Sequence, residues 1–314
     1  MALDFTPFEL TEPSAAAIAL VCDSPHSGTH YPRDFDHAVP RELLRQGEDT
    51  HVDALWQAVP EVGGTLLAAH FPRTYIDPNR TEDDIDPDLL EQAWPTALNP
   101  SEKTRLGYGL IWRNVRADMP IYQRRLRVDE VRARIEHCYR PYHLALSQAI
   151  ARSVERFGAV WHLNLHSMPN NAYERLKIQS SRPLADFVLG DRDGSTCEPA
   201  LVELVAEHLR GCGYSVAVND PYKGVQLIAQ IGQPALRRHS LQIEIRRPIY
   251  MDEATRERNA NFAQVQTDLR ALLLRLAGQI RHFLAHILKL LLRILGRSVW
   301  GKRQKEHRYN QSEI

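Results

Sequence analysis

Short apolar runs alternate with amphipathic segments along most of the chain. Runs bounded by turn-forming residues predict buried strands at 17–22, 65–69, 109–112, 159–165, 215–218 and 241–245. Apolar positions at steps of three and four predict helices at 50–58, 126–152 (where Pro141 interrupts the pattern) and 199–209. Strands that alternate with helices are typical of a layered sheet, and the chain has no internal repeat. We therefore expect an α/β fold, with a central sheet flanked by helices.

The last part of the chain carries a different pattern. From 272 to 299, apolar residues recur at steps of three and four and form a wide apolar face. A basic stripe accompanies this face and consists of His282, His286, Lys289, Arg293 and Arg297. These charges interrupt the apolar residues too often for a membrane span, which needs about 20 mostly apolar residues. The pattern predicts a C-terminal basic amphipathic helix.

Three fates of this helix are open. It can pack on the body of the protein or on a second subunit, lie on an anionic membrane surface, or remain a mobile extension. Packing is the commoner fate of an apolar face, whereas Trp300 at the end of a basic amphipathic helix suits a membrane interface. We expect the helix to be dispensable for chemistry, so that a chain cut after Gly278 stays active.

Charge and cysteine usage exclude several classes of protein. Lys and Arg together equal Asp and Glu at 39 each, so the chain is not a polycation of the kind that binds nucleic acid. The four cysteines stand far apart, which excludes zinc-finger and thioredoxin motifs. The first residues lack the basic and apolar regions of a signal peptide. We therefore expect a cytoplasmic protein with reduced thiols.

Two histidines lie where predicted strands end. His26 comes shortly after the strand 17–22, and His166 directly follows the strand 159–165. The carboxyl ends of neighbouring parallel strands meet at one edge of a sheet, so the two imidazoles are candidates for one metal site. A catalytic zinc needs about three protein ligands and an open position for water. The alternative is a histidine that only caps backbone groups, the commoner case in a chain with 14 histidines.

The third ligand stays open at this point. Acidic residues crowd the segment 47–53, where Glu48, Asp49 and Asp53 are all candidates. Asp49 precedes a predicted helix, so it is equally a candidate N-cap. His30, four residues after His26, is a further alternative.

Glu244 is the best candidate for a general base. It lies inside an apolar strand and shares one face with Gln242. A carboxylate in such a place has to be paired, bound to a metal or raised in pKa. A raised pKa suits acid–base catalysis, whereas the alternative is a salt bridge to Arg246 or Arg247.

A second polar cluster contains Arg73, Asp77, Asn79 and Arg80. Guanidinium and amide donors suit a carboxylate, and Lys223 in a predicted loop is a further candidate for orienting an anion. The alternative is an ordinary surface turn, because Asp-Pro-Asn is typical of turns. The chain contains no P-loop, dinucleotide fingerprint or serine-hydrolase elbow.

Taken together, these segments resemble the N-formylglutamate amidohydrolase family. The matching stretches follow one another in order: SPHSGTHYP (24–32), EDTHVDALW (48–56), RTYIDPNR (73–80), GLIWR (109–113), IY (121–122), RIEHCYRPYH (134–143), LNLHSMP (163–169), ADFVLGDRDGSTC (185–197) and LQIEI with IYMDE (241–253). The family is related to zinc carboxypeptidases and aspartoacylases. The resemblance implies a single α/β domain of that type over residues 1–266, with a mixed sheet, followed by the C-terminal helix and tail at 267–314.

The resemblance also implies roles for the metal and the base. It implies one zinc ion per chain, with His26, Asp49 and His166 as its ligands. Glu244 corresponds to the glutamate that activates the zinc-bound water.

Other residues correspond to substrate contacts of the family. Asn79 and Arg80 match a pair that holds a substrate carboxylate, and Arg73 matches an arginine that polarises the scissile carbonyl. After Lys223-Gly224 the chain reads VQLIAQIG, where the family pattern has an arginine.

The implied activity is zinc-dependent hydrolysis of the N-acyl amide of an acidic amino acid, such as N-formylglutamate, in histidine degradation. The alternatives are an amidohydrolase for another N-acyl amino acid or peptide-like substrate, and a non-catalytic binding protein on the same fold.

Overall fold

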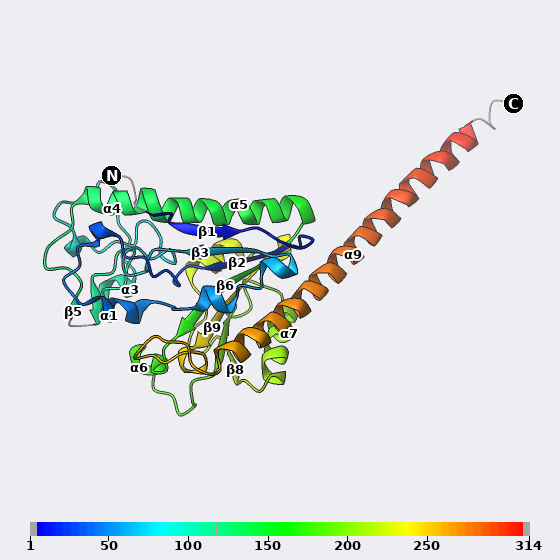
Figure 1. Cartoon of the computed structure of the whole chain (residues 1–314). Coiled ribbons are helices and arrows are strands. Elements are labelled where there is room, and N and C mark those ends of the chain that lie inside the picture. The colour runs from blue at the N-terminus through cyan, green and yellow to red at the C-terminus, as the bar shows by residue number, and fades with distance from the viewer. Residues whose placement is uncertain (1–4, 117–118, 310–314) are drawn as a thin grey trace.

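A seven-stranded mixed sheet forms the centre of the computed structural model (Figure 1). The structure describes residues 5–116 and 119–309, with side chains in the last helix as far as His286 and at Lys289. The strands lie in the order β1 (Phe8–Thr11), β3 (Thr65–Ala69), β2 (Leu20–Ser24), β6 (Val160–Met168), β9 (Arg238–Arg246), β7 (Phe187–Gly190) and β8 (Val216–Val218). The inner strands β3, β2, β6 and β9 are parallel, whereas β1 and β7 run antiparallel to their inner neighbours.

Helices and a small second sheet surround this centre. The helices are α1 (Arg41–Leu44), α2 (Val52–Leu55), α3 (Glu102–Arg105), α4 (Val128–Arg134), α5 (Arg140–Phe157), α6 (Ala172–Arg175), α7 (Pro199–Gly211), α8 (Gln226–Ile231) and α9 (Phe262–Tyr309). The small sheet pairs β4 (Asn114–Arg116) with β5 (Met119–Pro120). The expected single α/β domain with a mixed sheet is confirmed, while its likeness to zinc carboxypeptidases stays a prediction.

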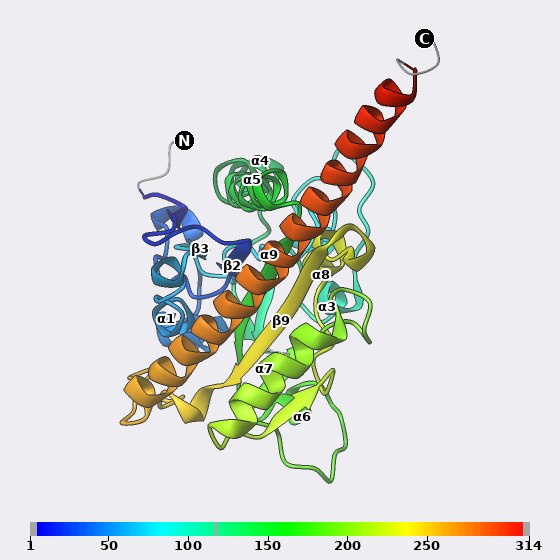
Figure 2. The ribbon, with the colours of Figure 1, turned by 90° about the vertical axis from the view of Figure 1, so that its right-hand side faces the viewer.

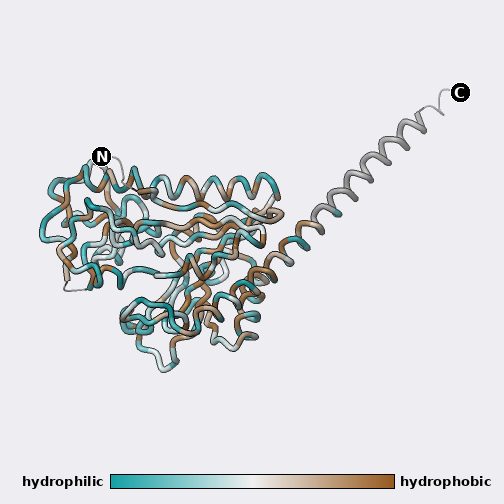
Figure 3. The backbone as a smooth tube through the Cα atoms, in the orientation of Figure 1, coloured by the Kyte–Doolittle hydropathy of each residue, from teal (hydrophilic) through white to brown (hydrophobic). Residues whose placement is uncertain are grey.

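The two faces of the sheet have separate apolar cores. On one face, alternate residues of β6 and β9 such as Leu163 and Ile243 pack with α2, α7 and α9. On the other face, Val21 and Leu67 pack with α4, α5 and α8. Figure 2 shows α7 and α9 crossing one face with α5 on the opposite side, and Figure 3 shows apolar residues gathered along the sheet and the first turns of α9.

Two local predictions from the pattern differ from the structure. The strand predicted at 109–112 is wrong, because the backbone of Leu110 pairs with loops: its N–H donates to the Asp84 carbonyl, and its carbonyl accepts from the Asp77 N–H. Pro141 does not end the helical segment. It closely follows a π-helical turn at Ile135–Tyr139, which joins α4 to α5 without a break, so the irregularity in the helix lies close to the residue that lacks an N–H.

The first half of α9 belongs to the core of the protein. Its buried residues join the same cluster as β6 and β9: Phe262, Val265, Leu269, Leu272, Leu273, Leu276, Ala277 and Ile280. Phe283 and Leu284 are partly buried against that cluster. The division suggested between 266 and 267 therefore falls inside one continuous helix. In the part of the chain that the structure describes, no helix has the length and hydropathy needed to cross a bilayer.

The second half of the predicted basic stripe, Arg293 and Arg297, lies outside the described side chains. Contact of this part of α9 with a membrane or a second subunit therefore stays a prediction.

A pair of truncations tests the packing of α9. A cut after Gly278 removes Ile280, which is 1% exposed, together with Phe283 and Leu284. Because loss of one buried aliphatic side chain costs about 2–5 kcal/mol, this variant should be markedly destabilised, in contrast to the sequence-based expectation. A cut after Ala285 keeps these contacts and should unfold at nearly the wild-type denaturant concentration. Equal midpoints for the two variants would show that the 279–285 turns do not belong to the core.

Candidate metal and catalytic site

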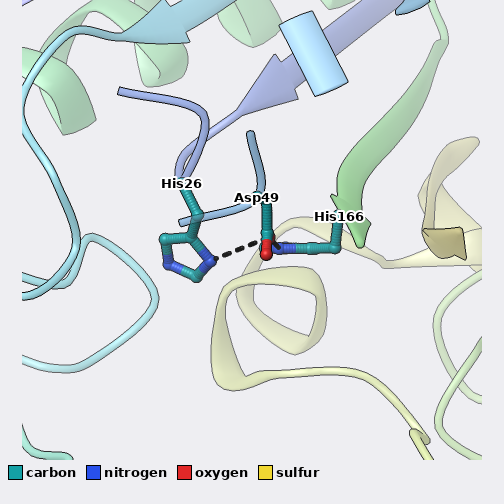
Figure 4. A group of neighbouring side chains, drawn as sticks. All are labelled: His26, Asp49 and His166. Carbon is teal, nitrogen blue, oxygen red and sulfur yellow. Dashed lines mark hydrogen bonds and ion pairs between the residues drawn. The ribbon is translucent and has the colours of Figure 1, made fainter. Parts of the chain in front are cut away.

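Three buried side chains meet beyond the carboxyl ends of β2 and β6. His26 lies in the loop after β2, Asp49 precedes α2, and His166 lies near the end of β6 (Figure 4). One donor atom from each lies within 4.8 Å of the other two. Asp49 Oδ2 is 3.0 Å from His166 Nδ1 and 3.5 Å from His26 Nδ1. The structure thus brings together the three residues that the resemblance implies as metal ligands.

Local backbone contacts hold these residues in place. The Asp49 N–H donates to the His26 carbonyl at 2.9 Å, which fixes one loop against the other. Gly28 lies so close to the backbone of 70–71 that a Cβ there would be 2.3 Å from the Phe71 carbonyl oxygen. Only glycine allows this approach, and it keeps the His26 loop against the end of β3.

The second ring nitrogen of His26 is bound by a carboxylate. His26 Nε2 lies 2.7 Å from Asp77 Oδ1, and Asp77 also accepts hydrogen bonds from Arg73 Nη2 at 2.9 Å and from the Asn79 N–H at 2.9 Å. Burial alone would raise the pKa of Asp77, but the charges of Arg73 and His26 hold this pKa well below its usual range. An ionised Asp77 accepts the Nε2–H of His26 and leaves Nδ1 as a lone-pair donor, as in carboxylate–histidine–metal arrangements.

Asp49 is also held ionised. Burial would raise its pKa, but the neighbouring imidazoles of His166 and His26 keep that pKa well below the ordinary carboxyl value. Arg247 Nη2 donates to Asp49 Oδ1 at 3.0 Å, and Ser167 Oγ lies 3.3 Å from the same oxygen.

The three residues fit a zinc ion by their donor chemistry. Two imidazoles and one carboxylate are a common ligand set for a catalytic zinc. His26 Nδ1 is buried and has no hydrogen-bond partner among the described residues. A buried polar atom without a partner is costly, and a cation in this position would satisfy it. The group could therefore hold a metal ion.

Glu244 lies directly beside this group. It is the register partner of His166 in the parallel pairing of β6 and β9, and Gln242 Nε2 donates to its Oε1 at 2.8 Å. Burial raises the pKa of Glu244 to about 7, against the opposing charge of His166. The two arginines considered as partners bind elsewhere, Arg246 to Asp186 and Arg247 to Asp49. Glu244 thus has the environment of a group that exchanges protons near neutral pH.

These residues line one large cavity of about 880 Å³. Such a volume is typical of small-molecule sites. Cationic side chains on its wall outnumber carboxylates; the cations are Arg73, Arg80, Lys103, Arg116, Arg175, Lys223 and Arg247, and the carboxylates are Asp49, Glu174 and Glu244. The cavity therefore favours an anionic ligand.

The predicted substrate contacts all line this cavity, but their present partners differ. Arg80 is fixed by the Tyr108 carbonyl, 2.9 Å from Nε, and by the Asn79 carbonyl, 3.1 Å from Nη1. The Asn79 side-chain nitrogen lies 2.9 Å from His166 Nε2, so this amide faces the metal group. Lys223 is paired with Asp193 at 2.9 Å, and both side chains are largely exposed.

The alternative third ligands lie outside the group. Glu48 is buried but accepts hydrogen bonds from Tyr31 at 2.7 Å and from Thr50 at 2.9 Å. Asp53 lies within α2, and burial raises its pKa. His30 is exposed, and its ring stacks on Phe5.

For three further residues of the site, the contact that the structure shows was not predicted from the sequence. Asp77 orients His26, Asn164 contacts His166, and Arg247 binds Asp49. The contact of Asn164 with His166 could have been predicted, because Asn164 precedes His166 by two residues and therefore lies on the same face of the strand.

The model of the N-formylglutamate amidohydrolase family matches residues 18–251, a range that contains all of these site residues. The chain belongs to this family. It is 29% identical over 238 residues to N-formylglutamate deformylase from Pseudomonas aeruginosa, covering 75% of this chain and 83% of the relative. It is 27% identical over 248 residues to N-formylglutamate deformylase from Pseudomonas putida, with the same coverage of 75% and 83%.

Solved structures give a consistent result. The crystal structure of N-formylglutamate amidohydrolase from Ralstonia eutropha is 70% identical, with a TM-score of 0.88 over 88% of this chain and 99% of that chain. A gene product from Agrobacterium tumefaciens shares the fold at 19% identity, with a TM-score of 0.57 over 88% of this chain and 97% of that one.

Proposed function

We propose that this protein hydrolyses the formyl amide of N-formylglutamate, giving formate and glutamate, with one zinc ion held by His26, Asp49 and His166. One observation carries the proposal: a buried His–Asp–His group with an unpartnered His26 nitrogen lies beside Glu244 on the wall of a cationic cavity. The names of the relatives from Pseudomonas and Ralstonia support the choice of substrate.

The metal and the protein would contribute different chemistry. A bound Zn²⁺ supplies Lewis-acid polarisation and lowers the pKa of a water molecule towards about 7. Asp77 and Asn164 keep the imidazoles of His26 and His166 oriented.

Glu244 moves the proton. Its carboxylate accepts a proton from the attacking water as the water oxygen bonds to the formyl carbon. The same group then returns the proton to the amide nitrogen as the C–N bond breaks, so that formate and the free amine leave. A pKa raised to about 7 by burial suits both steps, because the carboxyl can accept and release a proton near neutral pH.

Arg73 is assigned to the carbonyl oxygen. Its Nε and Nη2 donate to Asp77 Oδ2 at 3.3 and 2.9 Å, and its guanidinium lies over the Trp112 ring. We assign Nη1, which makes neither of these bonds, to the oxygen on which negative charge develops. The ion pair with Asp77 fixes this donor before the substrate arrives.

Arg80, with Asn79 beside it, is assigned to a substrate carboxylate. Backbone carbonyls fix the Arg80 guanidinium at the cavity wall, so little side-chain entropy is lost when a carboxylate binds. Lys223 would first have to exchange its exposed partner Asp193 for the substrate.

Replacing Arg80 by alanine should mainly weaken capture of the acidic substrate. A hydrogen bond to a charged group contributes about 1.5–3 kcal/mol, which corresponds to a loss in kcat/KM of roughly 10- to 150-fold for N-formylglutamate. Arg80→Lys keeps the charge and should restore part of this loss. If both variants had the wild-type kcat/KM, Arg80 would be only a structural part of the turn.

A substrate panel tests the function itself. N-formylglutamate should be hydrolysed with a higher kcat/KM than N-formylaspartate, N-acetylglutamate or N-formylmethionine. Activity should vanish on chelation and return with one equivalent of Zn²⁺ per chain, measured by elemental analysis. Full activity without any transition metal would contradict the metal assignment, and preference for a neutral acyl-amino acid would contradict the substrate assignment.

A further inference from the structure

A column of polar side chains is buried in the sheet beneath α5. Successive side-chain hydrogen bonds link Ser240 on β9 to His162 on β6, and His162 to Asp23 on β2. Further hydrogen bonds link Asp23 to Asn164 on β6, and Asn164 to His166. Asp23, His162, Asn164 and Ser240 are each 0% exposed. Alternate residues of these strands point to the apolar core on the other face. Burying polar groups in the centre of a sheet is costly even when they are hydrogen-bonded, so the column calls for an explanation beyond packing.

Asp23 is the fixed acceptor of this column. Its Oδ1 accepts from His162 Nε2 at 2.9 Å and from Asn164 Nδ2 at 2.8 Å, and its Oδ2 accepts from the Tyr142 hydroxyl at 2.8 Å. Burial would raise the pKa of Asp23, but hydrogen bonds from His162, Asn164 and Tyr142 lower it below the ordinary value. An ionised carboxylate can only accept hydrogen bonds.

This acceptor determines how the Asn164 side chain is oriented. Because the amide nitrogen of Asn164 has to face Asp23, its carbonyl oxygen faces His166 and lies 2.7 Å from Nε2. A carbonyl oxygen is also only an acceptor. Nε2 of His166 therefore carries the proton, and Nδ1, 3.0 Å from Asp49 Oδ2, keeps its lone pair for a metal ion in the neutral ring.

We propose that Asn164, oriented by Asp23, is a positioning residue that fixes the tautomer and the ring orientation of His166 for metal binding. The inference rests on the proposed metal site. Asn164 would give His166 the same kind of support that Asp77 gives His26.

The neighbouring Asn79 amide has to turn over for this assignment. Its Nδ2 lies 2.9 Å from the same His166 nitrogen, and its Oδ1 has no hydrogen-bond partner among the described residues. A protonated Nε2 cannot accept from an amide N–H. Turning the Asn79 amide over would place its oxygen against Nε2–H, so that both amide side chains beside this nitrogen would accept from it.

Two variants of one residue separate positioning from packing. Asn164→Leu removes the acceptor for His166, and we expect Zn²⁺ affinity, measured by chelator competition, to fall about 10- to 100-fold, as for other outer partners of ligating histidines. Asn164→Asp keeps an oxygen for Nε2–H and can share a proton with Asp23, so it should retain Zn²⁺ affinity within a few-fold of the wild type. Wild-type affinity in Asn164→Leu would overturn the proposal.

A matched control changes the partner of the other oxygen of Asp23, Oδ2. Tyr142→Phe removes the hydrogen bond to Asp23 Oδ2 but leaves the Asn164–His166 contact in place. It should lower the free energy of unfolding without changing Zn²⁺ affinity. If it weakened Zn²⁺ binding as much as Asn164→Leu does, the column would have only a general structural role, and the proposal would be wrong.

A measurement on the unaltered protein covers the case in which Asn164→Leu does not fold. In ¹⁵N-labelled wild-type protein loaded with Zn²⁺, the His166 ring should show a slowly exchanging proton on Nε2. A proton on Nδ1, or zinc bound through Nε2, would overturn the proposal. If the wild-type protein bound no Zn²⁺ at all, the proposed function itself would fail. If the wild type bound Zn²⁺ and the Asn164→Leu variant bound it with the same affinity, only the positioning role of Asn164 would be refuted.

Discussion

Replacing Glu244 by glutamine should lower kcat for N-formylglutamate by about 10²- to 10⁴-fold, the usual contribution of a general base. Glutamine preserves the shape of the side chain and can still pair with Gln242, but it cannot take a proton from water. Fold and Zn²⁺ content should stay at wild-type levels. Steady-state kinetics, elemental analysis and thermal unfolding of the same preparation would measure all three.

The control for this variant is Glu203→Gln on the exposed side of α7, which makes the same chemical change away from the cavity and should leave kcat unaltered. The pH profile provides a second readout. Wild-type activity should fall on the acid side, because a protonated Glu244 cannot act as a base. An unchanged kcat in Glu244→Gln would mean that this buried carboxyl is only structural.

The strands that lead to the site could be predicted from the sequence because their apolar runs are short, continuous and bounded by turns. β3 occupies the predicted residues, and β6 and β9 extend beyond the predicted runs into polar residues. The extension of β6 carries His166, whereas Glu244 lies within the predicted run of β9. The apolar pattern marks only the face that packs under α7 and α9, whereas the functional residues lie on the opposite face.

The partners of the site residues could not be predicted in the same way. Asp77 contacts His26 across 51 positions of sequence, and Asn164 contacts Asp23 across 141. Such pairs depend on strand order and register, which no local pattern determines. The residues 77–79 are typical of a turn and do form one, yet the same turn supplies the carboxylate that orients His26.

The choice among the acidic residues near α2 needed three-dimensional information as well. Asp49 and Asp53 are one helical turn apart, so periodicity places them on similar sides. His51 has a positive φ of 68°, and the helix begins only at Val52. Asp49 therefore belongs to the loop, and the hydrogen bond from its N–H to the His26 carbonyl directs it to the two histidines.

Because Asp49 faces the two histidines and Asp53 does not, we expect the Asp49→Asn variant to lose the metal ion and the Asp53→Asn variant to keep it. Asparagine at 49 removes the negative charge between His26 and His166, so Zn²⁺ affinity should fall by more than the 10- to 100-fold typical of an outer partner, and activity should drop to the level of the metal-free protein.

The same substitution leaves Arg247 without its carboxylate partner. Breaking a buried ion pair costs about 3–5 kcal/mol, so thermal unfolding has to accompany the binding measurement. His166→Ala removes a ligand without removing the Arg247–Asp49 pair, and it should lose Zn²⁺ with a smaller loss of stability. Retention of one Zn²⁺ per chain by Asp49→Asn, together with its loss from Asp53→Asn, would transfer the carboxylate ligand to Asp53 and show that the group in Figure 4 is not the metal site.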